Sequence, residues 1–399
     1  MPRAVLALNA GSSSIKFVLA EIGDGDAMVA VASGEIEEID TEPHFFARNT
    51  EGALIGERRW SRDSAPGHES LLSGLLEWVD AHLGPDTLAA AGHRVVHGGR
   101  DFTTPVLLTE KIVQALDRLT PLAPLHQPCS LLPVRAIMAL RPALPQVACF
   151  DTAFHHTLPA VATRFALPRA YEAEGVRRYG FHGLSYEYIA RRLRQTEPHL
   201  AAGRVIVAHL GNGASLCALR DGRAIDTTMG FTALDGLMMG TRCGTIDPGV
   251  LLYMQQQKGL SPHEVEAVLY KQSGLLGVSG LSSDMRTLLS SDDVHAQEAI
   301  ELFVHRIARE AAALTGMLGG LDGFVFTAGI GEHAVEIRAA VCERLRWLGL
   351  VCDPAANARH ASQISTPDSR VDVRVIPTDE GAMIVHHTLD VLQRAAKAA

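Results

Sequence analysis

Short apolar runs separated by turns of glycine, asparagine and serine dominate the first 150 residues. Some runs alternate apolar with polar positions, as strands with one buried face do, and others are apolar throughout, as strands buried on both faces are. Leucine and valine recur at helical spacing over 68–82, behind a Pro-Gly start. The pattern predicts strands over 4–8, 15–21, 27–36, 53–60, 89–96 and 146–150, and further helices over 111–118 and up to residue 140.

The second half repeats the pattern. Apolar runs predict strands over 205–209, 215–220 and 223–228, followed by helices and a strand over 323–327. Three or more strands before the first helix, and then strands alternating with helices, indicate a mixed α/β fold. Because 399 residues exceed one ordinary core, we expect two domains. The first would comprise 1–150 and a C-terminal helix, 381–399, and the second 151–380.

Two glycine-rich loops occupy equivalent places in the two halves. One contains Asn9, Gly11 and Ser12 to Ser14, and the other runs from Gly211 to Ser215, each between two apolar runs. Such loops leave room for a phosphate group and offer it backbone N–H groups. Either loop alone is equally typical of an ordinary hairpin with a glycine turn. Their repetition predicts a nucleotide bound between two related domains.

Composition restricts the class of protein. Hydrophobic residues make up 47% and charged residues 20%, which is typical of a globular chain. The net charge of -9 argues against binding to nucleic acid or to an anionic membrane, although a local arginine cluster remains compatible with an anionic substrate. The six cysteines lack CxxC spacing and the chain contains no HExxH, so a zinc site has little support. We found no signal peptide or membrane span and therefore expect a cytoplasmic protein.

Charged residues next to glycines or at strand ends are candidates for phosphoryl transfer. Arg94 and Arg242 lie in GHRVVHGG and GLMMGTRCGTIDPG, where glycine leaves space around a guanidinium group. Asp151 and Asn9 each follow an apolar run, and Glu380 follows VRVIPTD. Carboxylate and amide oxygens at strand ends are suited to Mg²⁺, bound directly or through water. The alternatives are solvated arginines and helix caps.

Several histidines stand beside glycine or proline. His182, in RYGFHGLSY, precedes a glycine that we expect to begin a helix, and its ring could donate to a phosphate oxygen. His126, in PLAPLHQPC, is a weaker candidate, and His209 opens the second loop but could equally be a core histidine. His93 and His97 are interpreted as structural.

The nucleotide-binding candidates lie on the second half. GFVFTAGIGEH predicts a strand that enters a helix through Gly329 and Gly331, where a flat ring could approach the backbone. SSDMRTL places Asp284 and Arg286 at a helix start, which is also the pattern of a plain helix cap. The chain has neither a GxGxxG fingerprint nor a GxxxxGK[ST] P-loop.

Taken together, the motifs resemble the acetate kinase family of short-chain carboxylate kinases, in order and at family spacing from residue 4 to about 385. The resemblance implies two duplicated ribonuclease H-like domains, as in actin-like ATPases, with a nucleotide cleft between them. It also implies reversible, Mg²⁺-dependent phosphoryl transfer from ATP to a carboxylate in a homodimer. The motifs that carry it are LNAGSSSIKF, GHRVVHGG, PLAPLHQP, FDTAFH, RYGFHGLSY, HLGNGAS, MGFTALDGLMMGTRCGTIDPG, FTAGIGE and IPTDEG.

The resemblance assigns a role to each matched position. Asp151, Arg242, His182 and Arg94 would be catalytic, and Asn9, Glu380 and Asp151 would be linked to Mg²⁺. Arg94 would hold the substrate carboxylate, beside an acyl pocket of Val96, Leu125, Phe181 and Ala233, with His126 in a supporting position. The nucleotide would contact Ser14, Lys16, His209, Leu210, Gly211, Asn212, Gly213, Asp284, Met285, Arg286, Gly329, Ile330, Gly331 and His333.

Four positions depart from the family pattern. Ala233 replaces a usual proline beside the acyl pocket, so propionate or butyrate kinase is the alternative function. Gly381 stands where a second glutamate is common, and His333 replaces a frequent asparagine near the nucleotide. Cys129 also departs, without a functional explanation. A non-kinase ATP-binding protein of the actin or chaperone type is less compatible, because it would need neither Arg94 nor Arg242.

Overall fold

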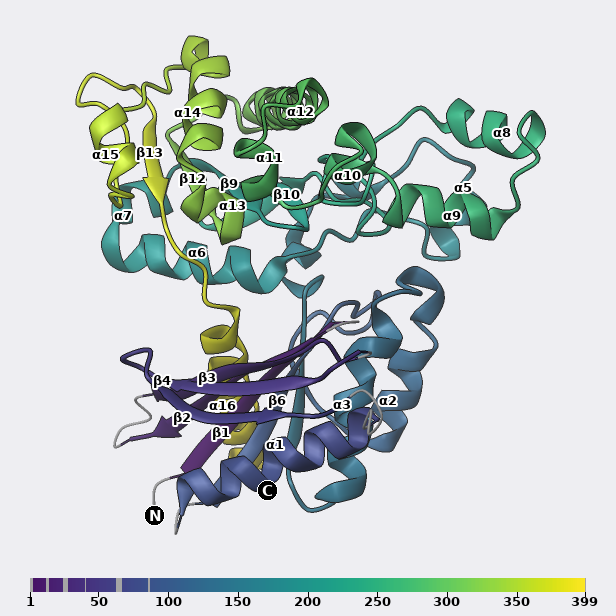
Figure 1. The fold of residues 1–399 in the computed structure, drawn as a ribbon, viewed down its shortest axis with the longest axis vertical. Helices are drawn as coiled ribbons and strands as arrows, with labels where there is room; N and C mark the ends of the chain where they lie inside the picture. Colours follow the sequence, from purple (N-terminus) through teal and green to yellow (C-terminus); the bar gives the residue numbers. More distant parts are fainter. Residues whose placement is uncertain are drawn as a thin grey trace. The chain divides into compact units, whose positions relative to one another are not determined.

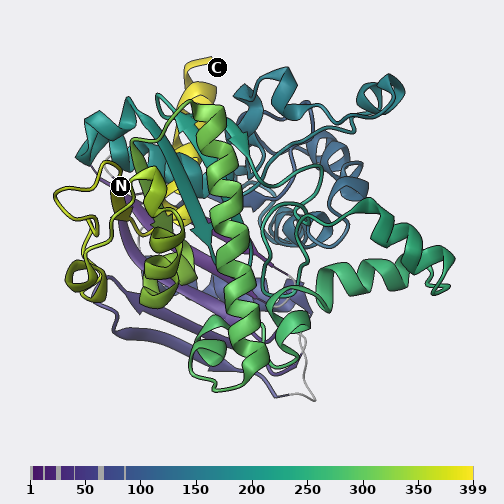
Figure 2. The same ribbon diagram turned by 90° about the horizontal axis from the view of Figure 1, so that it is seen from above.

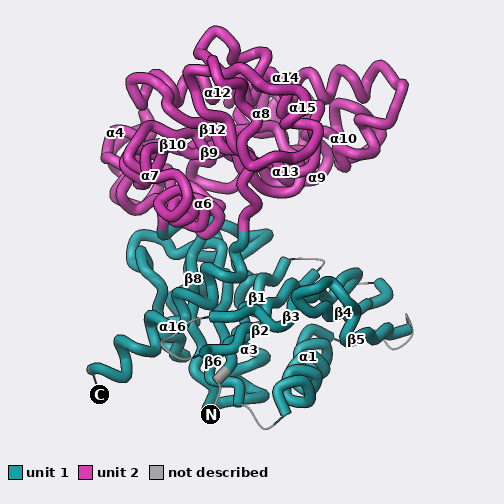
Figure 3. Tube along the Cα trace, turned by 90° about the vertical axis from the view of Figure 1, so that its left-hand side faces the viewer, with its two compact units in different colours: residues 1–153, 379–399 teal, residues 154–378 magenta. Residues whose placement is uncertain are grey.

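The computed structural model describes residues 3–11, 14–23, 28–39, 41–61, 67–84 and 87–398. The chain forms two compact units, residues 1–153 with 379–399 and residues 154–378 (Figure 3). Ser12 and Ser13 of the first loop, and Ala27 at the start of a predicted strand, lie outside the described residues. None of the described helices combines the length and the hydropathy needed to cross a bilayer.

The first unit is built around one mixed sheet in the order β5-β4-β3-β2-β1-β6-β8-β7. Leucines of α1 and the apolar residues of β1 form its core on one side, and α16 packs on β1, β6 and β8 (Figures 1 and 3). Its elements are β1 (Arg3–Ala10), β2 (Ile15–Ile22), β3 (Met28–Glu37), β4 (His44–Asn49), β5 (Leu54–Arg59), α1 (His68–Leu83), β6 (Thr87–Val95), β7 (Val106–Leu107), α2 (Glu110–Asp117), a 3₁₀ turn (Thr120–Leu122), α3 (Gln127–Leu140), β8 (Gln146–Phe150) and α16 (Glu380–Ala398).

The second unit has a smaller sheet in the order β11-β10-β9-β12-β13, with α6 and the long α12 on its two faces (Figures 1 and 2). Because helices cover both faces, β9 is buried along nearly its whole length. Its elements are a 3₁₀ turn that begins before the unit (Ala153–Thr157), α4 (Ala160–Thr163), α5 (Arg169–Ala173), α6 (Gly183–Thr196), α7 (Pro198–Ala201), β9 (Arg204–Leu210), β10 (Ala214–Arg220), β11 (Arg223–Thr227), α8 (Pro248–Gln256), α9 (Pro262–Lys271), α10 (Gly274–Ser279), α11 (Met285–Leu289), α12 (Val294–Leu318), β12 (Gly323–Thr327), α13 (Ala328–His333), α14 (Val335–Arg344), a 3₁₀ turn (Arg346–Leu348), α15 (Pro354–Ala358) and β13 (Asp372–Val375).

The two sheets share a topology. In each, three antiparallel strands (β1, β2 and β3; β9, β10 and β11) are followed by strands that pair in parallel, first β6 with β1 and β12 with β9. The corresponding strand orders are β3-β2-β1-β6-β8 and β11-β10-β9-β12-β13. The predicted duplicated α/β fold is therefore confirmed, whereas β4, β7 and β13 were not predicted.

Candidate active site

Four polar side chains of the first unit meet at one edge of its sheet. Asn9 lies near the end of β1, Arg94 near the end of β6 and Asp151 directly after β8, while Glu380 begins α16. Since β1, β6 and β8 run in parallel, their carboxyl ends share this edge. The sequence-based placement of Asp151 and Asn9 at strand ends is confirmed.

Arg94 is the centre of the cluster. Its Nε donates to both carboxylate oxygens of Asp151 at 2.9 and 3.1 Å, its Nη2 donates to Oδ2 at 2.5 Å, and its Nη1 donates to Asn9 Oδ1 at 3.0 Å. The other end of Asn9 donates to Glu380 Oε2 at 3.3 Å. These bonds use three of the five N–H groups of the guanidinium, so two are left for a substrate oxygen.

The electrostatics of the cluster favour a cation. Burial opposes the charge on Arg94, but Asp151 and Glu380 outweigh it and raise the pKa of the guanidinium above its usual range. Asp151 is only 1% exposed and its carboxylate is paired with Arg94. The side chains of Arg94, Asp151 and Glu380 together carry one net negative charge. Carboxylate and amide oxygens that retain unused lone pairs are the donor set that Mg²⁺ prefers, so these residues fit the ion.

Gly381 has a structural reason to be glycine. A Cβ at this position would lie 2.5 Å from Val18 Cγ2, so a glutamate there would require the Val18 side chain to move. Glu380 is thus the acidic residue of this helix start that lies at the cluster. Cys129 also has a structural role, since its thiol, in the first turn of α3, donates at 3.6 Å to the carbonyl oxygen of Leu125, which precedes the helix.

The glycine loop of the second unit joins β9 to β10. Gly211 N donates to Gly213 O at 3.0 Å, which closes the tight turn. A Cβ on Gly213 would lie 2.9 Å from Arg242 Nη2 and 3.1 Å from His182 Nε2. The two nitrogens therefore lie within about 6 Å of each other and both face the loop.

His182 reaches this position from the N-terminus of α6. It caps the helix in the left-handed conformation (φ 58°) that precedes Gly183, which confirms the predicted helix start. Its ring stacks on His209 with centroids 4.2 Å apart and planes 19° apart. Its Nδ1 lies 2.9 Å from Ser215 Oγ, which also hydrogen-bonds to the Tyr186 hydroxyl.

Arg242 is fixed by its own loop. Its Nη1 donates to Ala233 O at 2.7 Å, and Met239 N donates to Arg242 O at 3.1 Å. The loop contacts the phosphate-loop candidate, because Gly240 N donates to Asn212 O at 3.0 Å and a Cβ on Gly240 would overlap the Asn212 side chain. The carbonyl group of Ala233 therefore holds the Arg242 guanidinium.

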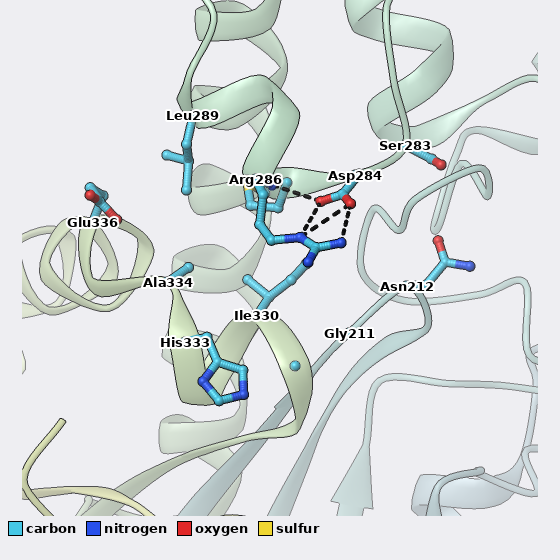
Figure 4. Close-up of a pocket in the computed structure, with 12 residues that line it drawn as sticks. Gly211, Asn212, Ser283, Asp284, Arg286, Leu289, Ile330, His333, Ala334 and Glu336 are labelled. Carbon is cyan, nitrogen blue, oxygen red and sulfur yellow. Dashed lines mark hydrogen bonds and ion pairs between the residues drawn. The ribbon is translucent and has the colours of Figure 1, made fainter. Parts of the chain in front are cut away.

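A cavity of about 640 Å³ lies beside the glycine loop, between that loop, α11 and α13 (Figure 4). Asp284 caps α11, and it binds the Arg286 guanidinium at 2.6 Å, which lowers the pKa of the carboxyl group. The Arg286 side chain is 89% exposed and lines the cavity. The lining comprises Gly211, Asn212, Ser283, Asp284, Met285, Arg286, Leu289, Gly329, Ile330, His333, Ala334 and Glu336.

A buried arginine holds one wall of this cavity. Arg338 of α14 donates to Gly331 O at 3.0 Å and to Glu332 O at 2.6 Å, at the end of α13, and is fully buried. It also donates to the Asn357 side chain at 2.7 Å and to the Asn357 carbonyl at 3.0 Å. The wall formed by Ile330 is therefore held through its backbone.

The remaining predicted site residues have other surroundings. Lys16 is exposed on β2, with its amine 4.0 Å from Glu35, and the Ser14 carbonyl accepts from Gly11 N at 2.8 Å. Val96 is buried and Leu125 half-buried in the first unit, and Phe181 is buried in the second. Predicted nucleotide-binding residues that do not line the cavity are Ser14, Lys16, His209, Leu210, Gly213 and Gly331.

Sequence reasoning missed some residues of both regions. Leu289 follows Met285 by four positions on α11, a spacing that places both on the same helix face, and Glu336 lies at the start of α14, directly after α13. Ser215 was counted only as part of the loop, although the hairpin register pairs it with His209. Tyr186 had no sequence signal.

Comparison with known proteins covers nearly the whole chain. Residues 4–386 match the Acetokinase family. An acetate kinase of Rhodopseudomonas palustris is 54% identical over 391 residues (97% of this chain, 98% of the relative), and one of Methylocella silvestris is 50% identical over 404 residues, the full length of both.

Solved structures agree with these relatives. Porphyromonas gingivalis acetate kinase has a TM-score of 0.86 at 36% identity, and a propionate kinase from Francisella tularensis has a TM-score of 0.88 at 36% identity. Each comparison covers 98% of this chain and 100% of the other. The chain therefore belongs to the acetokinase family.

Proposed function

We propose that this protein is an acetate kinase, which transfers the terminal phosphoryl group of ATP reversibly to acetate and so forms acetyl phosphate and ADP. The observation that carries the proposal is the convergence of Arg242 Nη2 and His182 Nε2 on Gly213, beside a cavity that shares Asn212 with the same loop. Relatives with this name match over nearly the full chain.

Direct in-line transfer suits these residues. An ionised carboxylate is already a nucleophile, so no general base is required, and the protein contributes position and positive charge. Arg94 would hold the acetate carboxylate with the two N–H groups that Asp151 and Asn9 leave unused. Arg242 and His182 would donate to the oxygens of the transferring group.

Asn9, Asp151 and Glu380 would hold Mg²⁺, directly or through water. When bound, the ion would neutralise negative charge on the phosphate oxygens. Arg94 holds the Asp151 carboxylate in place through an ion pair, and Asn9 holds the Glu380 carboxylate by hydrogen bonding.

The cavity would take the adenosine part of the nucleotide. The Arg286 guanidinium offers a flat surface to a base, and the Ile330 side chain offers an apolar one. Asn212, in the glycine loop, would lie beside the phosphates. His333 is exposed at the same cavity, so it is the residue at which a preference among nucleotides would be set. The other glycine-rich loop, which contains Asn9 and Gly11, would face the transferring group.

Propionate or butyrate kinase is the second candidate. Ala233 supports it, because alanine leaves more space at the acyl pocket than proline, although one methylene changes binding by only about 1–3 kcal/mol. A solved relative in this structural group is a propionate kinase.

A homodimer in the cytoplasm completes the proposal. No residue of α8 is buried, although the helix carries Val250, Leu252 and Tyr253, which are 40 to 53% exposed. An apolar helix face of this kind is typical of a subunit contact, and we assign it to a second copy of the chain. Each of the six cysteines, all among the described residues, keeps a thiol, as the reducing cytoplasm favours.

The test is an acyl-phosphate trapping assay. The purified protein is incubated with ATP, Mg²⁺ and hydroxylamine and with formate, acetate, propionate or butyrate in turn, and Arg242→Ala serves as the catalytic control. We expect the highest kcat/KM with acetate and a loss of several orders of magnitude in Arg242→Ala. Trapped product with none of the acids would refute the kinase, and an optimum at butyrate would favour the second candidate.

A further inference from the structure

A chain of buried hydroxyl groups lies behind His182, on the side of the ring away from Gly213. We infer that Tyr186 and Ser215 are positioning residues that keep the proton of a neutral His182 on Nε2, the nitrogen that faces Arg242. This inference deepens the proposed function and rests on it only for the role of His182 in phosphoryl transfer.

The first step concerns Tyr186. Its side chain is fully buried, and its hydroxyl group hydrogen-bonds to Ser215 Oγ. Burial raises the pKa of Tyr186 well above its ordinary value, so the hydroxyl keeps its proton. A buried O–H without an acceptor costs about 1–3 kcal/mol. Tyr186 must therefore donate to Ser215.

The second step concerns Ser215. A serine hydroxyl has one proton. Ser215 Oγ accepts from Tyr186, so its own proton needs a second partner, and we assign it to His182 Nδ1, which lies 2.9 Å away. A neutral imidazole that accepts at Nδ1 carries its proton at Nε2. The reverse order, from His182 through Ser215 to Tyr186, would leave the tyrosine proton buried without an acceptor.

The third step concerns the ring's front side. Nε2 lies 3.1 Å from the position of a Cβ on Gly213, so its N–H is directed to the loop where the phosphates would lie. The stacked His209 holds the plane of the ring. His209 is itself supported by a similar pair, because Thr378 Oγ1 donates to Ser185 Oγ at 2.9 Å and Ser185 Oγ lies 2.9 Å from His209 Nδ1.

These hydroxyls would thus determine which ring nitrogen can donate to a transferring phosphoryl group. Without them the ring could place its proton on Nδ1, and Nε2 would then present a lone pair to the phosphate oxygens and repel them. Neither Tyr186 nor Ser215 needs to touch the substrate for this effect.

The direct test is ¹⁵N NMR of the full-length protein labelled at histidine, without nucleotide, at a pH at which His182 is neutral. His182→Gln identifies its signals. We expect a protonated Nε2 and an unprotonated Nδ1 in the unaltered protein, and a shift toward a mixture of tautomers in Tyr186→Phe and Ser215→Ala. Tyr179→Phe is the matched control, because it also removes a buried hydroxyl, one that donates to Gly175 O at 2.8 Å, and it should leave the His182 signals unchanged.

Kinetics supply a second readout. Tyr186→Phe and Ser215→Ala should each lower kcat about tenfold, because each removes one hydrogen bond that orients the His182 ring. KM for both substrates should be nearly unchanged. The double variant should be no slower than Ser215→Ala, since the same chain is already broken. Tyr179→Phe should keep its kcat.

The outcomes separate the two hypotheses. A proton on Nδ1 in the unaltered protein would overturn the inference without the need for any variant, and so would an unaltered kcat in both Tyr186→Phe and Ser215→Ala. An Nε2 proton in a protein that phosphorylates no acid would support the hydroxyl chain and refute the proposed function. Losses that add up fully in the double variant would show that Tyr186 does not act through Ser215.

Discussion

Gly213→Ala is a sharp perturbation of the candidate active site, because it adds one methyl group between its two nitrogen donors. The new Cβ would lie 2.9 Å from Arg242 Nη2 and 3.1 Å from His182 Nε2, whereas ordinary contact begins near 3.4 Å. The overlaps are therefore about 0.5 and 0.3 Å, and the side chains rather than the backbone must move.

The expected cost follows from this geometry. A displacement of about 1 Å at a reacting group can cost about a hundredfold in rate, so shifts of a few tenths of an ångström in both donors should lower kcat at least tenfold. The methyl group also occupies space that a phosphate oxygen would need. Stability should change by less than about 1 kcal/mol, because Gly213 has no left-handed φ that alanine would strain and the displaced groups are side-chain ends.

The assay compares kcat for acetyl phosphate formation and the urea unfolding midpoint. Gly316→Ala, on α12, is the control, because a Cβ there meets nothing within 4 Å, and it should keep full activity and gain slightly in stability. Full activity in Gly213→Ala would refute the convergence of the two donors on this loop. A large loss of stability would show that the backbone, and not the donors, had absorbed the overlap.

Three further predictions concern other parts of the chain. Arg94→Met should destabilise the protein by about 3–5 kcal/mol in urea unfolding, because it leaves the buried Asp151 carboxylate unpaired; adding Asp151→Asn should restore part of this, and no restoration would contradict the pairing. Burial lowers the pKa of His93 from 6.5 to about 4. Below pH 6.5 the unfolded chain therefore takes up a proton that the folded chain does not, and the free energy of unfolding falls by up to about 3 kcal/mol by pH 4. The stability difference between the unaltered protein and His93→Gln should therefore shrink between pH 7.5 and 5, and a constant difference would exclude the effect. Leu252→Glu should give a monomer in sedimentation velocity while Met317→Glu, an exposed change on α12, stays dimeric, and an unaltered protein that is monomeric would refute the dimer.

Sequence patterns predicted the duplicated fold because its central strands are the most apolar. The runs that became β1 and β9 are buried by helices on both faces, and their turns contain the glycines. The strands β4 and β13 escaped prediction for the opposite reason. In β13 the charged Asp372 and Arg374 alternate with valines and pair with each other, so the apolar signal of this edge strand is weak.

The residues of the candidate site likewise include some that the sequence predicts and some that it does not. Residues next to glycine or at strand ends, such as Asp151 and Gly213, could be predicted because the local sequence requires their position. Tyr186 could not, since its partner Ser215 is 29 positions away and only the packing of α6 on β9 brings them together. Hydrogen bonds between distant side chains have no period along the chain, so only the folded structure shows them.

The buried Arg338 restricts how the nucleotide cavity can change during evolution. Because its guanidinium binds the carbonyl groups of Gly331 and Glu332, the path of the α13 backbone is independent of the side chains that α13 presents to the cavity. Ile330 and His333 can therefore vary without loss of the helix. Substitutions at these two positions can therefore change which base the cavity accepts. A substitution of Arg338 would instead remove the hydrogen bonds that hold the α13 backbone, and with it the wall of the cavity.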